Sequence, residues 1–452
     1  MLTLLCLLLA VAAPAAHIDD PQLKFEKYTL PNGLTVILSE DHRLPQVAVD
    51  IWYHVGAANQ TPGHSGFAHL FEHLMFSGSR HLPEHFDKVM ESIGATQTNG
   101  STSFDRTNYF EIVPADKLPT ALWVESDRMG YLLDVLDQHK LEIQRDVVSN
   151  EKRERVENVP YGRSQQRVCD LLFPKPHPYY ECVIGDIGEI QAASLDEVRA
   201  FFRRYYGPNN ASLALVGDFD PAVAKQQIEK FFGSIPRGPE VQVPDVPQRD
   251  LPGVLRETVD DKLAEEPRLV LAWKGVRQFT DEEPAGDILG DVLGSGKTSR
   301  LYKALVFEKQ LASGVSAGDS TLGLGGWFQI TVTAARGHEL PELLPVVQGI
   351  IDEVKAHGVT AEEVERARRN IVANRLRTLE RIGGFGGRAD VLNEYQTYLG
   401  DPGYLPRDLA RYRAVTPEAV QAFAKKFLED GKRIELEVVP AKKTAAAEGG
   451  AK

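Results

Sequence analysis

The sequence predicts an α+β fold made of two homologous repeats, each a mostly antiparallel sheet covered by helices. Three observations support this prediction: alternating strand-like segments occur in both halves, long charged helical segments follow them, and a proline-rich segment separates the halves. The chain has 452 residues, which is too long for one core. We therefore assign residues 22–232 to the first repeat, 233–252 to a linker and 253–440 to the second repeat.

The first repeat is predicted from a series of strands and helices that begins after the turn Pro31-Asn32-Gly33. Alternation of apolar residues predicts strands at 34–38, 47–55, 108–113 and 211–216. Helical spacing predicts helices at 66–76, 118–136 and 139–156, and another that starts at Pro221. The linker contains Pro236, Pro239, Pro244, Pro247 and Pro252, which neither a regular helix nor a central strand accepts.

The second repeat follows the same order of elements. Strands are expected at 268–273 and 327–331, and helices at 285–293 and 361–379. The segment 327–331 matches 109–113 at a constant offset, and the long helix 361–379 matches the helix at 139–156. Residue identities are few, so the order of elements carries the inference of a repeat.

The N-terminus indicates an exported protein, and the bulk charge limits what the protein is expected to bind. A net charge of -13 argues against general nucleic-acid binding. Leu2 to Ala13 is almost wholly apolar and ends in Ala13-Pro14-Ala15, so residues 1–16 are expected to be a signal peptide that leads to the periplasm. No internal stretch is long and apolar enough to span a membrane. The tail 441–452 has the composition of a disordered segment.

Two cysteines remain after the signal peptide, Cys169 and Cys182. In an oxidising compartment they could form a disulfide, and two free thiols are an equally good interpretation. Neither cysteine has the spacing of a metal ligand.

The segment 69–73 (HLFEH) is the strongest functional signal. Residues three and four apart share a helix face, so His69, Glu72 and His73 point the same way. Two neutral imidazoles can hold one metal ion, while Glu72 takes a proton from water without being a ligand. Zinc suits such a site, and HxxEH is a known signature of zinc peptidases. Solvated histidines on a surface helix are the alternative, but the apolar neighbours Phe67 and Phe71 favour a partly buried site.

A third ligand is needed, and Glu151 is the best candidate. It lies in a charged helix that contains other acidic residues at comparable positions. Spacing alone therefore leaves three competitors: Glu142, Glu154 and Glu157.

Several motifs closely resemble the pitrilysin/insulinase family of zinc peptidases. They are residues 66–78 (GFAHLFEHLMFSG), 150–153 (NEKR), 205–211 (YYGPNNA) and 217–218 (GD). The resemblance extends from Leu23 to Val439, and the chain is similar to half-length zinc subunits such as the beta subunit of the mitochondrial processing peptidase.

The resemblance implies a site and a binding mode. It implies that Glu151, which follows an asparagine in its helix, is the third zinc ligand. It also implies that peptides add as a strand to the sheet edge at 98–102, where Asn99, beside Gly100, holds the substrate backbone. The alternative for Asn99 is a turn residue.

The second repeat lacks the metal-binding pattern. The positions that match His69, Glu72 and His73 are Asp287, Gly290 and Asp291, and Glu151 matches a position near Arg375. We therefore expect one zinc ion per chain.

The resemblance implies a further Arg/Tyr pair that holds the substrate across a chamber. Here the two positions hold Val306 and Ser313, while Arg300 lies in a Ser-Arg-Leu segment whose role in the family is structural. We therefore expect a heterodimer with a homologous subunit that has no zinc and supplies the pair; a homodimer is the other arrangement.

The expected function is a zinc-dependent metalloendopeptidase that hydrolyses unfolded peptides inside a closed chamber. A non-catalytic structural subunit is the alternative, although such members usually have degraded metal motifs. One further segment, 383–387 (GGFGG), either lines the chamber or only ends a helix, and the second interpretation is favoured.

Overall fold

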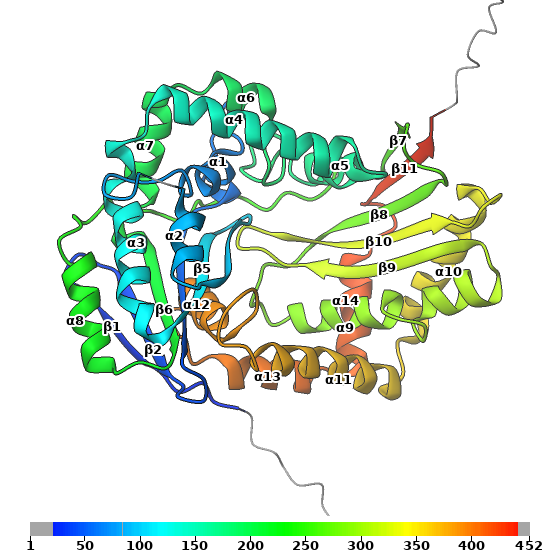
Figure 1. The fold of residues 1–452 in the computed structure, drawn as a ribbon. Coiled ribbons are helices and arrows are strands. Elements are labelled where there is room, and N and C mark those ends of the chain that lie inside the picture. The colour runs from blue at the N-terminus through cyan, green and yellow to red at the C-terminus, as the bar shows by residue number, and fades with distance from the viewer. Residues whose placement is uncertain (1–20, 84, 442–452) are drawn as a thin grey trace, which may run out of the picture.

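The structure is a computed structural model that describes residues 21–83 and 85–441, and it contains two sheets, each covered by helices (Figure 1). The predicted α+β fold with two repeats is confirmed. The predicted signal peptide 1–16 and all of the predicted tail except Ala441 lie outside the described residues.

The first sheet has the strand order β1-β2-β6-β3-β5-β4. Its strands β2 and β6 are parallel, and its other neighbours are antiparallel. The strands are β1 (Glu26–Thr29), β2 (Thr35–Glu40), β3 (Gln46–Tyr53), β4 (Thr96–Thr102), β5 (Thr107–Pro114) and β6 (Ala211–Gly217).

The second sheet repeats this topology in the order β7-β11-β8-β10-β9, with β7 and β11 parallel and the other pairs antiparallel. Each of its strands therefore has a counterpart in the first sheet, and β9 corresponds to the edge strand β4. The strands are β7 (Leu255–Asp261), β8 (Arg268–Gly275), β9 (Ala312–Ser320), β10 (Gly326–Ala334) and β11 (Ile434–Pro440).

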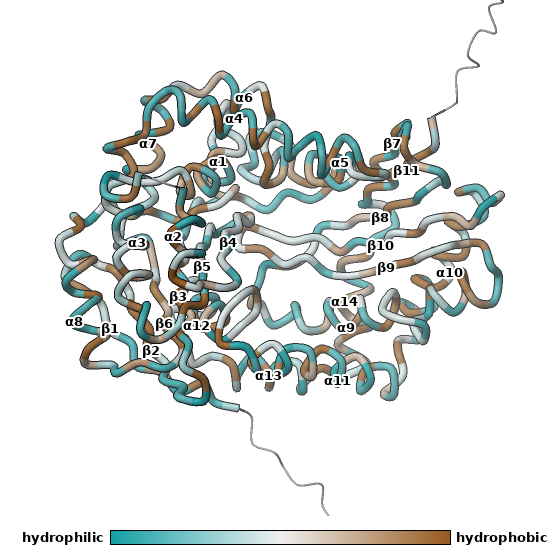
Figure 2. Tube along the Cα trace, viewed as in Figure 1, coloured by the Kyte–Doolittle hydropathy of each residue, from teal (hydrophilic) through white to brown (hydrophobic). Residues whose placement is uncertain are grey.

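Helices fill the connections of both halves. In the first half they are α1 (Phe67–Leu74), α2 (Phe86–Ser92), α3 (Leu118–Tyr131), α4 (Gln138–Lys152), α5 (Gly162–Leu172), α6 (Ile187–Ala192), α7 (Leu195–Tyr205) and α8 (Pro221–Phe232). In the second half they are α9 (Glu283–Gly294), α10 (Leu340–His357), α11 (Ala361–Thr378), α12 (Arg388–Leu399), α13 (Leu405–Ala414) and α14 (Pro417–Phe427). Figure 2 shows hydrophilic and hydrophobic residues alternating along these helices, as expected for helices with one buried face.

Two helices cross between the halves. Helix α5 belongs to the first half but packs on β11 and β8 of the second sheet (Figure 1). Its residues Val168 and Leu172 share a hydrophobic cluster with Ile434 and Leu436. Helix α12 belongs to the second half and packs on β6 and β3 of the first sheet. Each sheet is therefore packed against a helix from the other half.

The structure pairs Cys169 with Cys182 in a disulfide, with 5.7 Å between their Cα atoms. Cys169 lies near the end of α5, and Cys182 lies in the following loop, which returns to the start of α1. The disulfide therefore fastens this loop to the helix that crosses to the second sheet.

Candidate metal centre

Helix α1 carries the histidines, and its start is fixed by close backbone packing. Gly66 precedes the helix with φ +78°, and a Cβ there would lie 2.7 Å from the carbonyl oxygen of Ile184. A Cβ on Gly185 would in turn lie 2.5 Å from the Gly66 Cα, so neither position accepts a side chain. The apolar face of the helix is buried, and Phe71 stacks on Phe201 of α7 with ring centroids 5.4 Å apart.

Helix α4 carries Glu151 near its C-terminal end. Asp137 caps the helix by accepting a hydrogen bond from the backbone N–H of Lys140. Directly after Lys152 the helix widens into a π-helix over Arg153–Glu157, a distortion often found at functional sites. The buried Lys152 Nζ donates to the Gly185 carbonyl at 2.6 Å. This bond joins the end of α4 to the loop that packs on Gly66.

His69, His73 and Glu151 converge on one point. His73 Nε2 lies 3.0 Å from Glu151 Oε2, and His69 Nε2 lies 3.5 Å from the same oxygen. Ligand atoms at about 2.0–2.1 Å around a tetrahedral zinc ion are about 3.4 Å apart, so these separations fit such an ion. His73 Nε2 is buried and has no aligned hydrogen bond, which leaves it available as a ligand. These residues form the one three-residue metal-type group in the described part of the chain.

The charge states of these groups suit metal binding. Burial lowers the pKa of His69 to about 4, so its imidazole is neutral near pH 7, as a ligand must be. Contact with His73 lowers the pKa of Glu151 despite partial burial, and His69 and Arg155 act in the same direction. Arg155 Nη1 lies 2.7 Å from Glu151 Oε1, the carboxylate oxygen that faces away from the histidines.

The surroundings of Glu72 shift its pKa in the opposite direction from that of Glu151. Burial raises the pKa of Glu72, although the nearby Thr102 hydroxyl and His73 oppose the shift. A carboxylate with a raised pKa accepts and returns a proton more readily near neutral pH.

These residues line a cavity of about 760 Å³ beside the edge strand β4. The predicted substrate residues Asn99 and Gly100 also line it, and Asn99 Oδ1 accepts a hydrogen bond from the Gly100 N–H at 2.9 Å. Sequence reasoning gave Arg155 no role, and for the segment 383–387, which supplies the lining residue Phe385, it favoured the end of a helix over a place in the chamber wall. Only the spacing of Arg155, four residues after Glu151 on a helix, offered a signal for its contact.

The competing candidates lie elsewhere. The side chains of Glu142, Glu154 and Glu157 are exposed and do not line the cavity. Of the other histidines near α1, His81 contacts Asp127 and His64 contacts Glu197.

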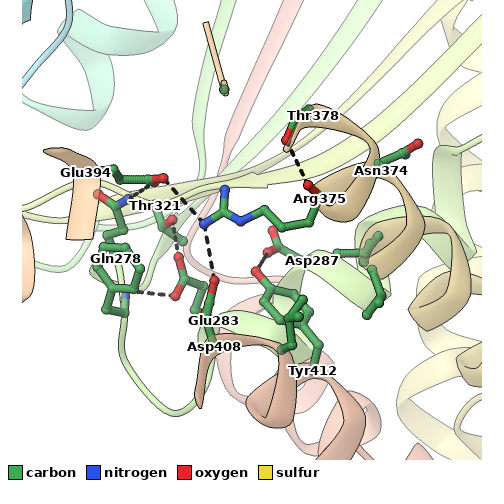
Figure 3. A pocket seen from close by; sticks show the side chains of 15 residues that line it. Gln278, Glu283, Asp287, Thr321, Asn374, Arg375, Thr378, Glu394, Asp408 and Tyr412 are labelled. Carbon is green, nitrogen blue, oxygen red and sulfur yellow. Dashed lines mark hydrogen bonds and ion pairs between the residues drawn. The ribbon is translucent and has the colours of Figure 1, made fainter. Parts of the chain in front are cut away.

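In the second repeat, the equivalent of the metal site is a pocket of ion pairs and hydrogen bonds with a volume of about 480 Å³ (Figure 3). The Tyr412 hydroxyl donates to Asp287 Oδ2 at 2.6 Å. Arg375 points toward Glu394 and Asp408, with Nη2–carboxylate distances of 3.4 and 3.2 Å (Figure 3). A cation, Arg375, therefore lies near the position that matches Glu151, and it is paired with the carboxylates beside it.

The two positions expected for an Arg/Tyr pair have structural surroundings. Val306 packs against the hydrophobic core of the second half. Ser313 Oγ on β9 donates a hydrogen bond to the Ala334 carbonyl at 3.1 Å. Arg300 does not replace the missing arginine, because it binds Glu363 through two hydrogen bonds of 2.7 Å at the start of α11.

Comparison with known proteins places the chain in a family. A model described as Insulinase (Peptidase family M16) matches residues 35–172, and one described as Peptidase M16 inactive domain matches residues 192–371. The chain is 29% identical over 405 residues to zinc protease PqqE of Helicobacter pylori, covering 88% of each chain. It is 25% identical over 420 residues to an uncharacterized zinc protease of Streptomyces coelicolor, covering 91% of this chain and 88% of the relative.

Solved structures agree with these matches. A protease from Helicobacter pylori superimposes with a TM-score of 0.85 at 26% identity, covering 93% of this chain and 100% of that one. The periplasmic protease PqqL from Escherichia coli shares the fold, with a TM-score of 0.74 at 18% identity, and this chain spans 48% of its length. The fold and the matches define the class of protein: a two-repeat α+β protein, with relatives that are named zinc proteases. The chain belongs to peptidase family M16.

None of the described helices is both long and apolar enough to cross a membrane.

Proposed function

We propose that this protein is a zinc-dependent endopeptidase that hydrolyses unfolded peptides inside a chamber closed by a second subunit. The observation that carries the proposal is that Glu72, His69, His73 and Glu151 line one cavity at a free sheet edge. His69, His73 and Glu151 hold the zinc ion, one per chain, in this proposal.

The residues of the cavity have distinct roles. Zinc, when bound, polarises a carbonyl group and lowers the pKa of water. Glu72 takes a proton from the attacking water on its carboxylate and gives it to the leaving amine. Glu151, kept anionic by His73 and Arg155, balances the charge of the ion.

Strand β4 is the proposed binding edge for the peptide. It ends the first sheet, so one row of its backbone groups is free to pair with an added strand. Asn99 and Gly100 line the cavity on this strand and hold the peptide backbone.

A homologous subunit is the proposed partner. Val306 and Ser313 offer neither a cation nor a phenol, so the substrate needs an Arg/Tyr pair from another chain. Export to the periplasm is also proposed, and the disulfide Cys169–Cys182 supports it because such bonds persist in oxidising compartments.

The test is zinc content and cleavage of a quenched, unstructured peptide by the wild type and by Glu72→Gln, with and without any partner that co-purifies. We expect Glu72→Gln to retain zinc and to lose about 10²–10⁴-fold in kcat. Glu142→Gln, an exposed change on α4 outside the cavity, is the matched control and should retain full activity.

The other outcomes are equally informative. Full activity of the purified chain alone as a monomer or homodimer would contradict the heterodimer. Absence of zinc and of cleavage, even with a partner, would favour a non-catalytic structural subunit.

A further inference from the structure

The glycine-rich loop 383–387 (GGFGG) belongs to the second half but lies on the first sheet. A Cβ on Gly383 would lie 2.7 Å from Ala48 Cβ on β3 and 3.2 Å from a side-chain carbon of Ile112 on β5. A Cβ on Gly387 would lie 2.3 Å from the Gly383 carbonyl oxygen. Glycine is therefore required for this close approach, which ending a helix alone does not explain.

Hydrogen bonds hold the loop in place. The Gly386 N–H donates to Asp390 Oδ2 at 2.7 Å, and Arg381 Nη2 donates to the Phe385 carbonyl at 2.7 Å. Asp390 Oδ1 in turn accepts from Trp52 Nε1 on β3 at 3.0 Å. The loop is thus held at Phe385 and Gly386 and is tied to the first sheet through Asp390.

Phe385 at the tip of this loop lines the same cavity as His69, His73 and Glu151. Its ring packs edge-on against Phe110, with centroids 4.8 Å apart, yet 46% of the residue is exposed. The exposed part of the ring lines the cavity. Because the loop is anchored, the ring loses little conformational entropy when it binds a ligand.

The strand register shows which part of a bound peptide would meet this ring. Tyr109 points toward α1, since its hydroxyl donates to the Phe71 carbonyl, and its neighbour Phe110 must therefore point to the opposite face. Asn99 of β4 pairs with Phe110, and Phe385 packs on that face. A peptide added along β4 would alternate its side chains between the α1 face and the Phe385 face.

We propose that Phe385, supported by Phe110, is a specificity-determining residue that forms an apolar subsite for the peptide. The subsite takes a large apolar side chain, aromatic or aliphatic, at one fixed position relative to the cleaved bond. The substrate class is therefore unfolded peptides with such a residue, and this inference rests on the proposed peptidase function.

The experiment uses two unstructured peptides that differ only by Phe or Ala at one central position. The wild type, Phe385→Ala and Phe385→Leu are tested with any co-purifying partner, and cleavage positions are read by mass spectrometry. We expect the wild type to cut at a fixed spacing from Phe. In Phe385→Ala we expect kcat/KM for the Phe peptide to fall about tenfold, with little change for the Ala peptide. Phe385→Leu should retain most of the preference, and all three proteins should hold equal zinc.

A second readout separates the subsite from catalysis. Binding of both peptides to Glu72→Gln and to Glu72→Gln/Phe385→Ala is measured by fluorescence anisotropy. A loss of affinity of about tenfold confined to the Phe peptide supports the subsite even without cleavage. Equal affinities, or equal losses for both peptides, overturn the subsite and leave the peptidase proposal standing. Absence of any peptide binding overturns both.

Discussion

Glu72 and Glu151 are two carboxylates in one cavity whose environments push their pKa values in opposite directions. Burial raises the pKa of Glu72, whereas contact with His73 lowers the pKa of Glu151. Two carboxylates whose pKa values differ in this way can perform different tasks: one transfers a proton, and the other remains anionic. The same residue type can therefore serve as base and as ligand in this fold.

The proposed ligand role of Glu151 predicts a selective loss of metal. Glu151→Gln keeps the shape of the side chain but removes its charge, so zinc affinity should fall more than about 100-fold. Glu154→Gln, an exposed change in the same segment, is the control and should bind zinc normally. Competition with a chromophoric chelator measures both affinities. Equal affinities in the two variants would contradict the ligand assignment.

Spacing in the sequence identifies His69, Glu72 and His73 as one cluster because a single helix carries all three. Spacing does not distinguish Glu151 from Glu142, Glu154 and Glu157 as the third ligand, because the approach of α4 to α1 depends on tertiary packing. Contacts such as that of Lys152 with the Gly185 carbonyl, which set this approach, have no local sequence signal.

At the scale of elements, the Glu363 carboxylate both caps the start of α11 and forms an ion pair with Arg300. Glu363 accepts from the Thr360 N–H at 2.8 Å, as in a capping box, and also accepts two hydrogen bonds from Arg300. Burial disfavours its ionised form, but Arg300 and Thr360 together lower the pKa of Glu363 to about 2. This contact joins the Ser-Arg-Leu segment to α11.

Loss of this contact should destabilise the fold in a pH-dependent way. Arg300→Ala should lower the free energy of unfolding by about 2 kcal/mol at neutral pH. Since the folded-state pKa of Glu363 is depressed, its contribution is complete above about 4.5, the ordinary value, and is lost as the pH falls toward about 2. Urea denaturation at several pH values should therefore show the difference from the wild type narrowing in acid. Lys303→Ala, whose contact with Glu308 is long and exposed, is the control and should change little.

Strands with alternating apolar residues are predictable, and the edge strands are not. The predicted strand 108–113 lies within β5, and 268–273 lies within β8. The edge strands β4 (TQTNGST) and β9 (ASGVSAGDS) have hardly any large apolar residues, because one neighbour and partial exposure demand little burial. The proposed binding edge at 98–102 is accordingly predicted by the family resemblance and not by its own residue pattern.

At the scale of the whole molecule, the two halves exchange a helix. Residues of α5 and β11 share one hydrophobic cluster, and residues of α12 and β6 share another. The sequence predicts two repeats in series, but its local patterns do not show that a helix of each repeat covers the sheet of the other. Packing between surfaces far apart in the chain decides this exchange.

The exchange predicts that the halves remain together after the linker is cut. A recognition site for a specific protease, inserted after the exposed Val243, allows cleavage of the folded protein. Because α5 and α12 each bury apolar residues on the opposite sheet, both pieces should elute together in size-exclusion chromatography.

Adding Val168→Asp, which places a charge at a fully buried position of α5, should separate the cut pieces or cause them to aggregate. Val223→Asp, at an exposed position of α8, is the matched control and should leave the cut protein intact. Immediate separation of the cut wild-type pieces into two soluble species would show that the exchanged helices contribute little to holding the halves together.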